Sequence, residues 1–136
     1  MSYEHTYVAP EKSQGAIRKM LLAHGASNVA FASDADKELE GLRATIHLDD
    51  RAYGVKIVVP LIQRRNAKAQ DQEHRRVWRV LYHHIKAIFE AADSGVIDIR
   101  ELLLPYFVTA NGKSLGEIFK IDMPKALEAP KRAFLE

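Results

Sequence analysis

The fold is decided by the stretch DQEHRRVWRVLYHHIKAIFEAAD, residues 71–93. At roughly 100° per residue, its apolar side chains fall within one arc of about 140°, and the opposite arc is mostly basic. This pattern predicts one long amphipathic helix whose apolar face packs in the core and whose basic face meets solvent. The apolar arc comprises Val77, Trp78, Leu81, Tyr82, Ile85, Ile88, Phe89 and Ala92, and the basic arc holds Arg75, Arg76, Arg79, His83 and Lys86 together with Glu90.

A small sheet is predicted to precede this helix. Apolar and polar residues alternate over residues 42–48 and again over residues 53–59, and residues 49–51 have the composition of a turn. With the β-prone residues 28–33 they predict an antiparallel meander. One face of such a sheet is apolar, so the long helix is expected to cover it.

Shorter elements are predicted on either side. Ser13 is expected to cap a helix that runs through His24. Residues 106–109 are a candidate fourth strand. Two pairs of residues have the spacing of a capping box, which marks the start of a helix. These pairs are Asp98 with Glu101 and Ser114 with Glu117.

The predicted fold class is therefore α+β. We expect a three- to four-stranded antiparallel meander covered by one long amphipathic helix plus short helices. Residues 1–120 are predicted to form a single domain. The proline and charge content of residues 121–136 predicts a C-terminal tail, either docked or flexible.

The composition narrows the class of protein. With 47% hydrophobic and 28% charged residues, the 136-residue chain has enough apolar material for a core without disulfides or metals. It has no cysteine, which excludes thiol nucleophiles and thiolate zinc sites. Its apolar runs are shorter than the roughly 18 residues of a membrane span, and residues 1–12 do not show the charged-then-apolar pattern of a signal peptide, so we expect no export. We therefore expect a cytoplasmic protein with no membrane partner.

The distribution of charge suggests a binding surface. The net charge of +2 is too small to indicate nucleic acid by itself, but residues 63–79 hold five Arg and one Lys against Asp71 and Glu73. Such a cluster can hold phosphate groups or an acidic protein partner. It is also what the solvated face of any amphipathic helix contains. Trp78 is in the middle of the apolar arc and is assigned to the core. The candidate binding residues are Arg64, Arg65, Arg75, Arg76, Arg79 and Lys86.

Residues for catalysis or metal binding do not form a recognisable pattern. The adjacent His83 and His84 point about 100° apart on a helix and cannot grip one ion together. The acidic residues 34–40 and 49–50 fall in apparent turns, where Asp is common for structural reasons. The segment GKSLG, residues 112–116, lacks the spacing of a phosphate-binding loop. We assign no catalytic residue, metal or cofactor, which favours a non-enzymatic role.

Several motifs in fixed order resemble a group of small proteins encoded in phages, prophages and other mobile elements, whose function is uncharacterised. The motifs are Lys12-Ser13, His24-Gly25-Ala26, the meander, the Arg75-x-x-Trp78-Arg79-x-Leu81 helix with Ile85-Lys86-Ala87 downstream, and residues 111–117. The resemblance covers roughly residues 10–120, and the tail has no counterpart in it. It implies a phage-type origin in a bacterial host and supplies no catalytic residues.

Two functions remain open at this point. The first is a phage-type accessory protein that binds nucleic acid through the basic helix face. The alternative is a protein-interaction module that acts on a host or phage protein, for example a defence-system inhibitor, or that self-associates into a homo-oligomer.

Overall fold

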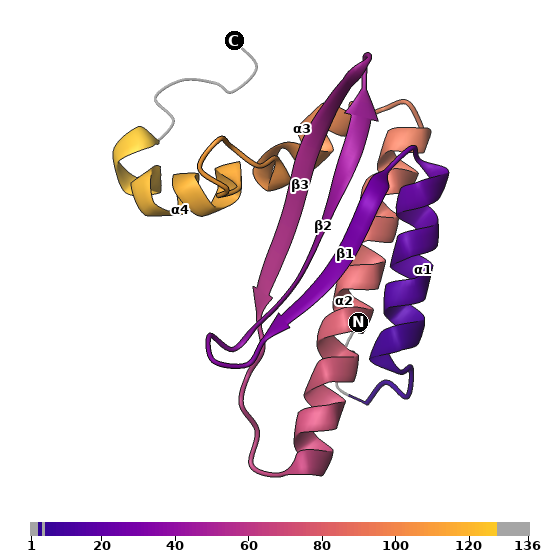
Figure 1. The fold of residues 1–136 in the computed structure, drawn as a ribbon, viewed down its shortest axis with the longest axis vertical. Coiled ribbons are helices and arrows are strands. Elements are labelled where there is room, and N and C mark those ends of the chain that lie inside the picture. The colour runs from indigo at the N-terminus through magenta and orange to yellow at the C-terminus, as the bar shows by residue number, and fades with distance from the viewer. Residues whose placement is uncertain (1–2, 4, 128–136) are drawn as a thin grey trace, which may run out of the picture.

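The computed structural model describes residue 3 and residues 5–127. A three-stranded antiparallel sheet carries two helices on one face, and a short helical arm leaves the sheet beside its third strand (Figure 1). The elements are α1 (Pro10–Ala23), β1 (Ser27–Asp34), β2 (Leu39–Leu48), β3 (Arg51–Pro60), α2 (Ala67–Asp93), α3 (Ile99–Leu103), the 3-10 helix η1 (Leu104–Tyr106) and α4 (Leu115–Ala126).

The sheet has the order β1-β2-β3, so the predicted α+β meander is confirmed. β2 is the central strand, with Leu42 opposite Phe31 on one side and opposite Ile57 on the other. Asp49 and Asp50 both have positive φ angles, which suits the tight turn between β2 and β3. The predicted fourth strand reduces to isolated bridges, among them Val55 with Phe107. The sheet therefore has three strands.

The core lies between the sheet and the two helices, and its centre is Trp78. This side chain is 1% exposed, and the ring of Phe31 meets it edge-on at 5.4 Å between centroids. Ile17 and Leu21 of α1 are buried in the same cluster. The prediction that the apolar arc of α2 faces the core is confirmed for the buried residues Val77, Trp78, Leu81, Ile85, Ile88 and Phe89.

The predicted cap at Ser13 is wrong. α1 begins at Pro10, three residues before Ser13, and the proline ring fixes a φ angle that suits the first helical position. Ser13 is instead fully buried inside the helix, and Nη1 of Arg79 donates to its Oγ at 3.4 Å. The helix ends as expected near His24, followed by Gly25 with a φ of +84°.

α2 begins four residues before the predicted start. Asn66 caps it, because its side-chain oxygen accepts a hydrogen bond from the backbone N–H of Ala69 at 2.9 Å. The helix ends at Asp93, followed by Ser94 and Gly95, as the sequence indicates.

For α3 and α4, the starts predicted from the sequence are closer to the observed boundaries than the predicted ends are. Ser114 and Glu117 form the predicted capping box, whereas the side chain of Asp98 accepts its hydrogen bond from Arg100 N rather than from Glu101 N. α4 continues through Pro124 to Ala126, so the expected domain boundary at residue 120 falls inside a helix. The remainder of the predicted tail, residues 128–136, lies outside the described residues.

Across the described residues, none of the helices is long and apolar enough to cross a membrane.

Candidate nucleic-acid interface

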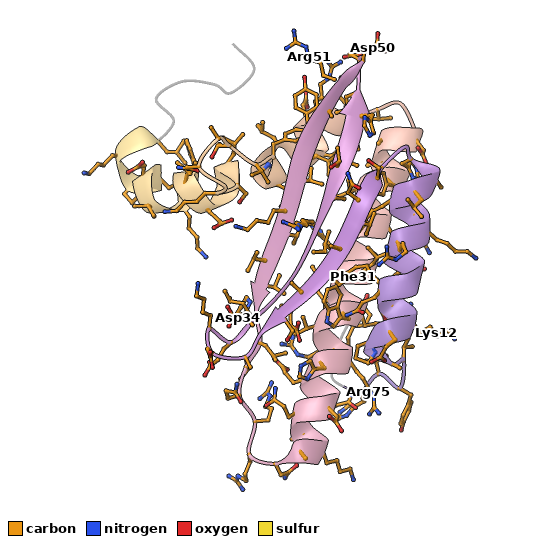
Figure 2. All side chains as sticks on the ribbon, in the orientation of Figure 1. Lys12, Phe31, Asp34, Asp50, Arg51 and Arg75 are labelled. Carbon is orange, nitrogen blue, oxygen red and sulfur yellow. The ribbon has the colours of Figure 1, made fainter. Side chains whose placement is uncertain are left out.

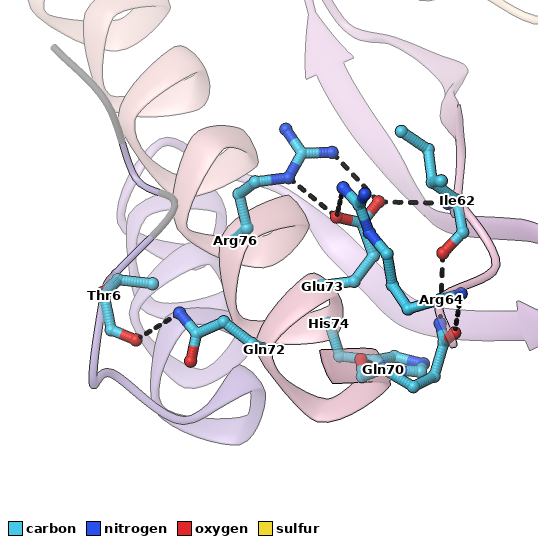
Figure 3. Close-up of polar contacts among 8 residues, drawn as sticks. All are labelled: Thr6, Ile62, Arg64, Gln70, Gln72, Glu73, His74 and Arg76. Atoms are coloured by element: carbon cyan, nitrogen blue, oxygen red, sulfur yellow. Dashed lines mark hydrogen bonds and ion pairs between the residues drawn. The ribbon is translucent and has the colours of Figure 1, made fainter. Parts of the chain in front are cut away.

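The buried carboxylate of Glu73 organises the N-terminal half of the predicted basic face. Its side chain is 1% exposed. Arg76 donates from Nε at 2.8 Å and from Nη2 at 3.0 Å, one bond to each carboxylate oxygen. Nη2 of Arg64 donates to the same carboxylate at 3.1 Å, and the backbone N–H of Ile62 at 3.0 Å (Figure 3). One acidic side chain thus fixes two guanidinium groups and the loop before α2.

The two cations dominate the electrostatics of this cluster. The hydrogen bond from Arg76 is the largest influence on the pKa of Glu73, and with the bonds from Ile62 and Arg64 it outweighs burial, which acts in the opposite direction. The pKa of Glu73 is lowered to about 2. The carboxylate is therefore ionised at neutral pH and offsets one of the two positive charges.

Gln70 adds a second tie between the loop and α2. Its side-chain oxygen accepts from the backbone N–H of Arg64 at 2.8 Å, and its amide nitrogen donates to the carbonyl of Ile62 at 3.3 Å. The loop therefore holds Arg64 in a fixed position relative to the helix.

Two adjoining clefts run along this end of α2. One, of about 580 Å³, is lined by Arg64 and Arg76, and the other, of about 450 Å³, by Lys68 and Arg75. The clefts share His5, Ala69 and Gln72 as lining residues. Among the described residues, Glu73 is the only acidic side chain that lines either cleft. Figure 2 shows Arg75 on this helix, near the N-terminal end of α1.

The first turn of α2 carries a charge that the helix itself disfavours. Lys68 lies in this turn, and no acidic residue does. The N-terminus of a helix has a partial positive charge, so a cation there costs about 0.3–1 kcal/mol and an anion is favoured. Exposed Arg65 lies just before the cap. The charges at this end are therefore suited to a bound anion rather than to helix stability.

The other two predicted residues lie apart from the clefts. Arg79 is directed toward α1 and Tyr82, with its guanidinium carbon 4.1 Å from the centre of the tyrosine ring. Lys86 is exposed, 3.8 Å from Glu90. Of the six predicted binding residues, the structure places Arg64, Arg75 and Arg76 in the two clefts, and Arg65 is exposed in the loop before α2.

A second buried carboxylate was assigned wrongly to a turn by the sequence. Glu40 is in β2, it is buried, and its Oε1 is 2.9 Å from Nε2 of His74. The other ring nitrogen of His74 is 3.1 Å from the carbonyl oxygen of Gln70. This pair lines a third cleft, of about 520 Å³, above Phe31 and Trp78. It joins the sheet to α2.

No group of three or more His, Asp or Glu side chains within the described part of the chain is placed to hold a metal ion. Comparisons with models of protein families, with curated proteins and with solved structures find no match to this chain. The candidate site is thus defined by its geometry alone.

The sequence predicted the arginines of this site but not the side chains that form ion pairs with them. The pair Glu73 and Arg76 is three residues apart on a helix, which is contact distance and was a usable signal. Lys68 was counted in the basic cluster of residues 63–79 but was not chosen as a candidate binding residue. His5 was overlooked because the N-terminal segment has no pattern that places it against α2.

Proposed function

We propose that this chain is a non-enzymatic binding protein that holds the phosphate backbone of nucleic acid at the N-terminal end of α2. The observation that carries the proposal is that four cationic side chains line two adjoining clefts, where Glu73 is the only carboxylate among the described lining residues. The cationic residues are Arg64, Lys68, Arg75 and Arg76.

The fixed arginines suit this role. A guanidinium that is already held in place loses less conformational entropy when it meets a phosphate. Arg64 uses Nη2 for Glu73, and a guanidinium has five N–H donors, so this side chain can also donate to a phosphate oxygen. Phosphate contacts of this kind carry no sequence information, and we expect binding without sequence preference.

The resemblance to proteins of phages and other mobile elements agrees with a role close to nucleic acid. That origin, and the expected cytoplasmic location, remain predictions.

The test is binding of fluorescent single-stranded and duplex oligonucleotides to the double variant Lys68→Glu/Arg75→Glu. These side chains line one cleft and neither contacts Glu73, so the fold should survive the change. Wild type should bind at low salt, and the slope of log K against log salt should fall by about 2 in the variant, because about one counterion is released per phosphate contact.

The matched control is Lys19→Glu/Lys86→Glu, which changes the net charge equally at exposed positions outside both clefts. It should bind almost as wild type does. Equal loss in both variants would mean that binding follows total charge and not the clefts. Absence of binding by wild type at low salt would end the proposal, and retention of an acidic polypeptide instead would favour the protein-interaction alternative.

A further inference from the structure

The arm formed by η1 and α4 exposes an apolar surface that the clefts do not use. α4 packs so closely on η1 that a Cβ at Gly116 would be 2.9 Å from the carbonyl oxygen of Pro105. Lys56 of β3 fixes the start of the arm, 2.9 Å from Glu117 and 3.2 Å from the carbonyl oxygen of Gly112. The arm therefore has a defined position beside the sheet (Figure 1).

A groove of about 530 Å³ lies between α4 and η1. Leu115, Phe119 and Met123 line it from α4, and Leu104 lines it from η1. Their exposed fractions are 37%, 46%, 50% and 54% in that order. Residues four apart share one side of a helix, so the three α4 residues form a stripe of roughly 12 Å along it.

The size of the apolar surface is sufficient for a weak contact between two copies of the chain. With Leu127, which follows α4 and is also half exposed but does not line the groove, these side chains present at most on the order of 500 Å² of apolar area, within the range of the largest patch on a monomer. Two copies together would remove at most about 1,000 Å² before any polar rim is counted, which is the lower limit for a specific interface, so the expected dimer is weak and reversible.

We propose that α4 is the dimerisation element of this protein, and that the groove is filled by α4 of a second copy. A stripe of equally spaced residues matches itself when reversed, as a two-fold axis requires: Leu115 would face Met123 of the second copy, and Phe119 would lie at the axis. Exposed charges on α4 are of both signs, with Glu117 and Asp122 against Lys120 and Lys125. A second copy therefore meets no excess of like charge.

The experiment is sedimentation of the full chain over about a hundredfold range of concentration, which brackets a micromolar dissociation constant. Wild type should pass from monomer to dimer. Phe119→Asp and Met123→Asp should each remain monomeric throughout, because each places a charge inside the apolar contact. Val96→Asp is the matched control, since Val96 is 84% exposed and lies away from the groove, and it should dimerise as wild type does.

Thermal unfolding of each variant at low protein concentration separates loss of dimerisation from loss of fold. Both α4 positions are about half exposed, so the monomers should unfold close to wild type. A second measurement uses the absence of cysteine from the chain. Under oxidising conditions Phe119→Cys should yield a disulfide-linked dimer, and Val96→Cys should not.

Three results would overturn the inference. The first is a wild-type monomer at every concentration, and the second is a dimer that Phe119→Asp leaves intact. The third is dimerisation that appears only after residues 128–136 are removed, which would make that segment the occupant of the groove. Oligonucleotide binding by a monomeric Phe119→Asp would show that the phosphate clefts act independently of this surface.

Discussion

Glu73 combines two roles at the scale of a single residue. It holds the loop before α2 through the backbone of Ile62, and it holds the guanidinium groups of Arg64 and Arg76 in the cleft. A buried ion pair of this kind contributes little when intact but is expensive to break, because the remaining charges lose their partner.

We predict that Glu73→Gln lowers the free energy of unfolding by about 2 to 3 kcal/mol at pH 7. The pKa of Glu73 is about 2 in the folded protein, below its ordinary value of 4.5. The stabilisation is therefore present above about pH 4.5 and is lost as the pH falls toward 2. Urea unfolding of both proteins at pH 7 and near pH 3 should show the difference shrinking. A difference that is equal at the two pH values would contradict this account.

The cations could be identified from the sequence, but their partners could not. Arg64 and Glu73 are nine residues apart, and Glu40 and His74 are joined only because β2 lies beside α2. Such pairs depend on the tertiary arrangement, which periodicity within one element does not determine. The core was easier to predict, because Trp78, Ile85 and Phe89 lie on one side of one helix.

At the scale of elements, the centres of helices and strands were predictable and several ends were not. The apolar periodicity starts after residue 70, so the first turn of α2 carries no such signal and depends on the cap at Asn66. Pro124 suggested an early end to α4. A proline in the last turn of a helix disrupts few hydrogen bonds, so the helix continues to Ala126.

The central strand contains a glycine that the sheet requires for space. A Cβ at Gly41 would lie 2.9 Å from the carbonyl oxygen of Ile57, which is backbone of the neighbouring strand. We predict that Gly41→Ala lowers the free energy of unfolding by about 1 to 3 kcal/mol, because the two strands must move apart.

The control is Gly54→Ala in the adjacent strand. A Cβ there would meet Val108 at 3.5 Å, an ordinary contact, so its stability should change by less than about 0.5 kcal/mol. Chemical denaturation of both variants tests the comparison, and equal losses would show that space at Gly41 is not the cause.

At the scale of the whole molecule, the protein consists of a body and an arm. The body is the sheet with α1 and α2, and the arm is η1 with α4, which makes fewer contacts with the rest of the protein. The strands and the helix pair contact one another extensively, whereas α4 packs against η1 and is linked to the sheet through Lys56. Local opening has a lower free energy where fewer contacts must be broken. The arm should therefore open before the body.

We predict that amide hydrogens of α4 exchange faster than those of β2 in native-state hydrogen exchange of the monomer, measured below the dissociation constant of the dimer. Lys56→Met should raise the exchange rate of the α4 amides a further two- to fivefold, because a partly exposed ion pair contributes about 0.5–1 kcal/mol. The exchange rate of the β2 amides should not change. Lys86→Met, which removes only the long contact to Glu90, should affect neither. Uniform acceleration of both elements by Lys56→Met would mean that the molecule opens as one unit.

On each outer strand of the sheet, a backbone carbonyl accepts a hydrogen bond from a group outside the three strands. Beside β3, the backbone N–H of Val108 donates to the carbonyl of Gly54 at 2.8 Å. On β1, the register shifts between Ser27 and Ala30, and Nη1 of Arg18 donates to the carbonyl of Val29 at 3.0 Å. Irregular edges with occupied carbonyls are poor templates for an incoming strand. We therefore expect the protein not to form fibres readily at high concentration, because strand addition needs a regular edge with unpaired backbone groups.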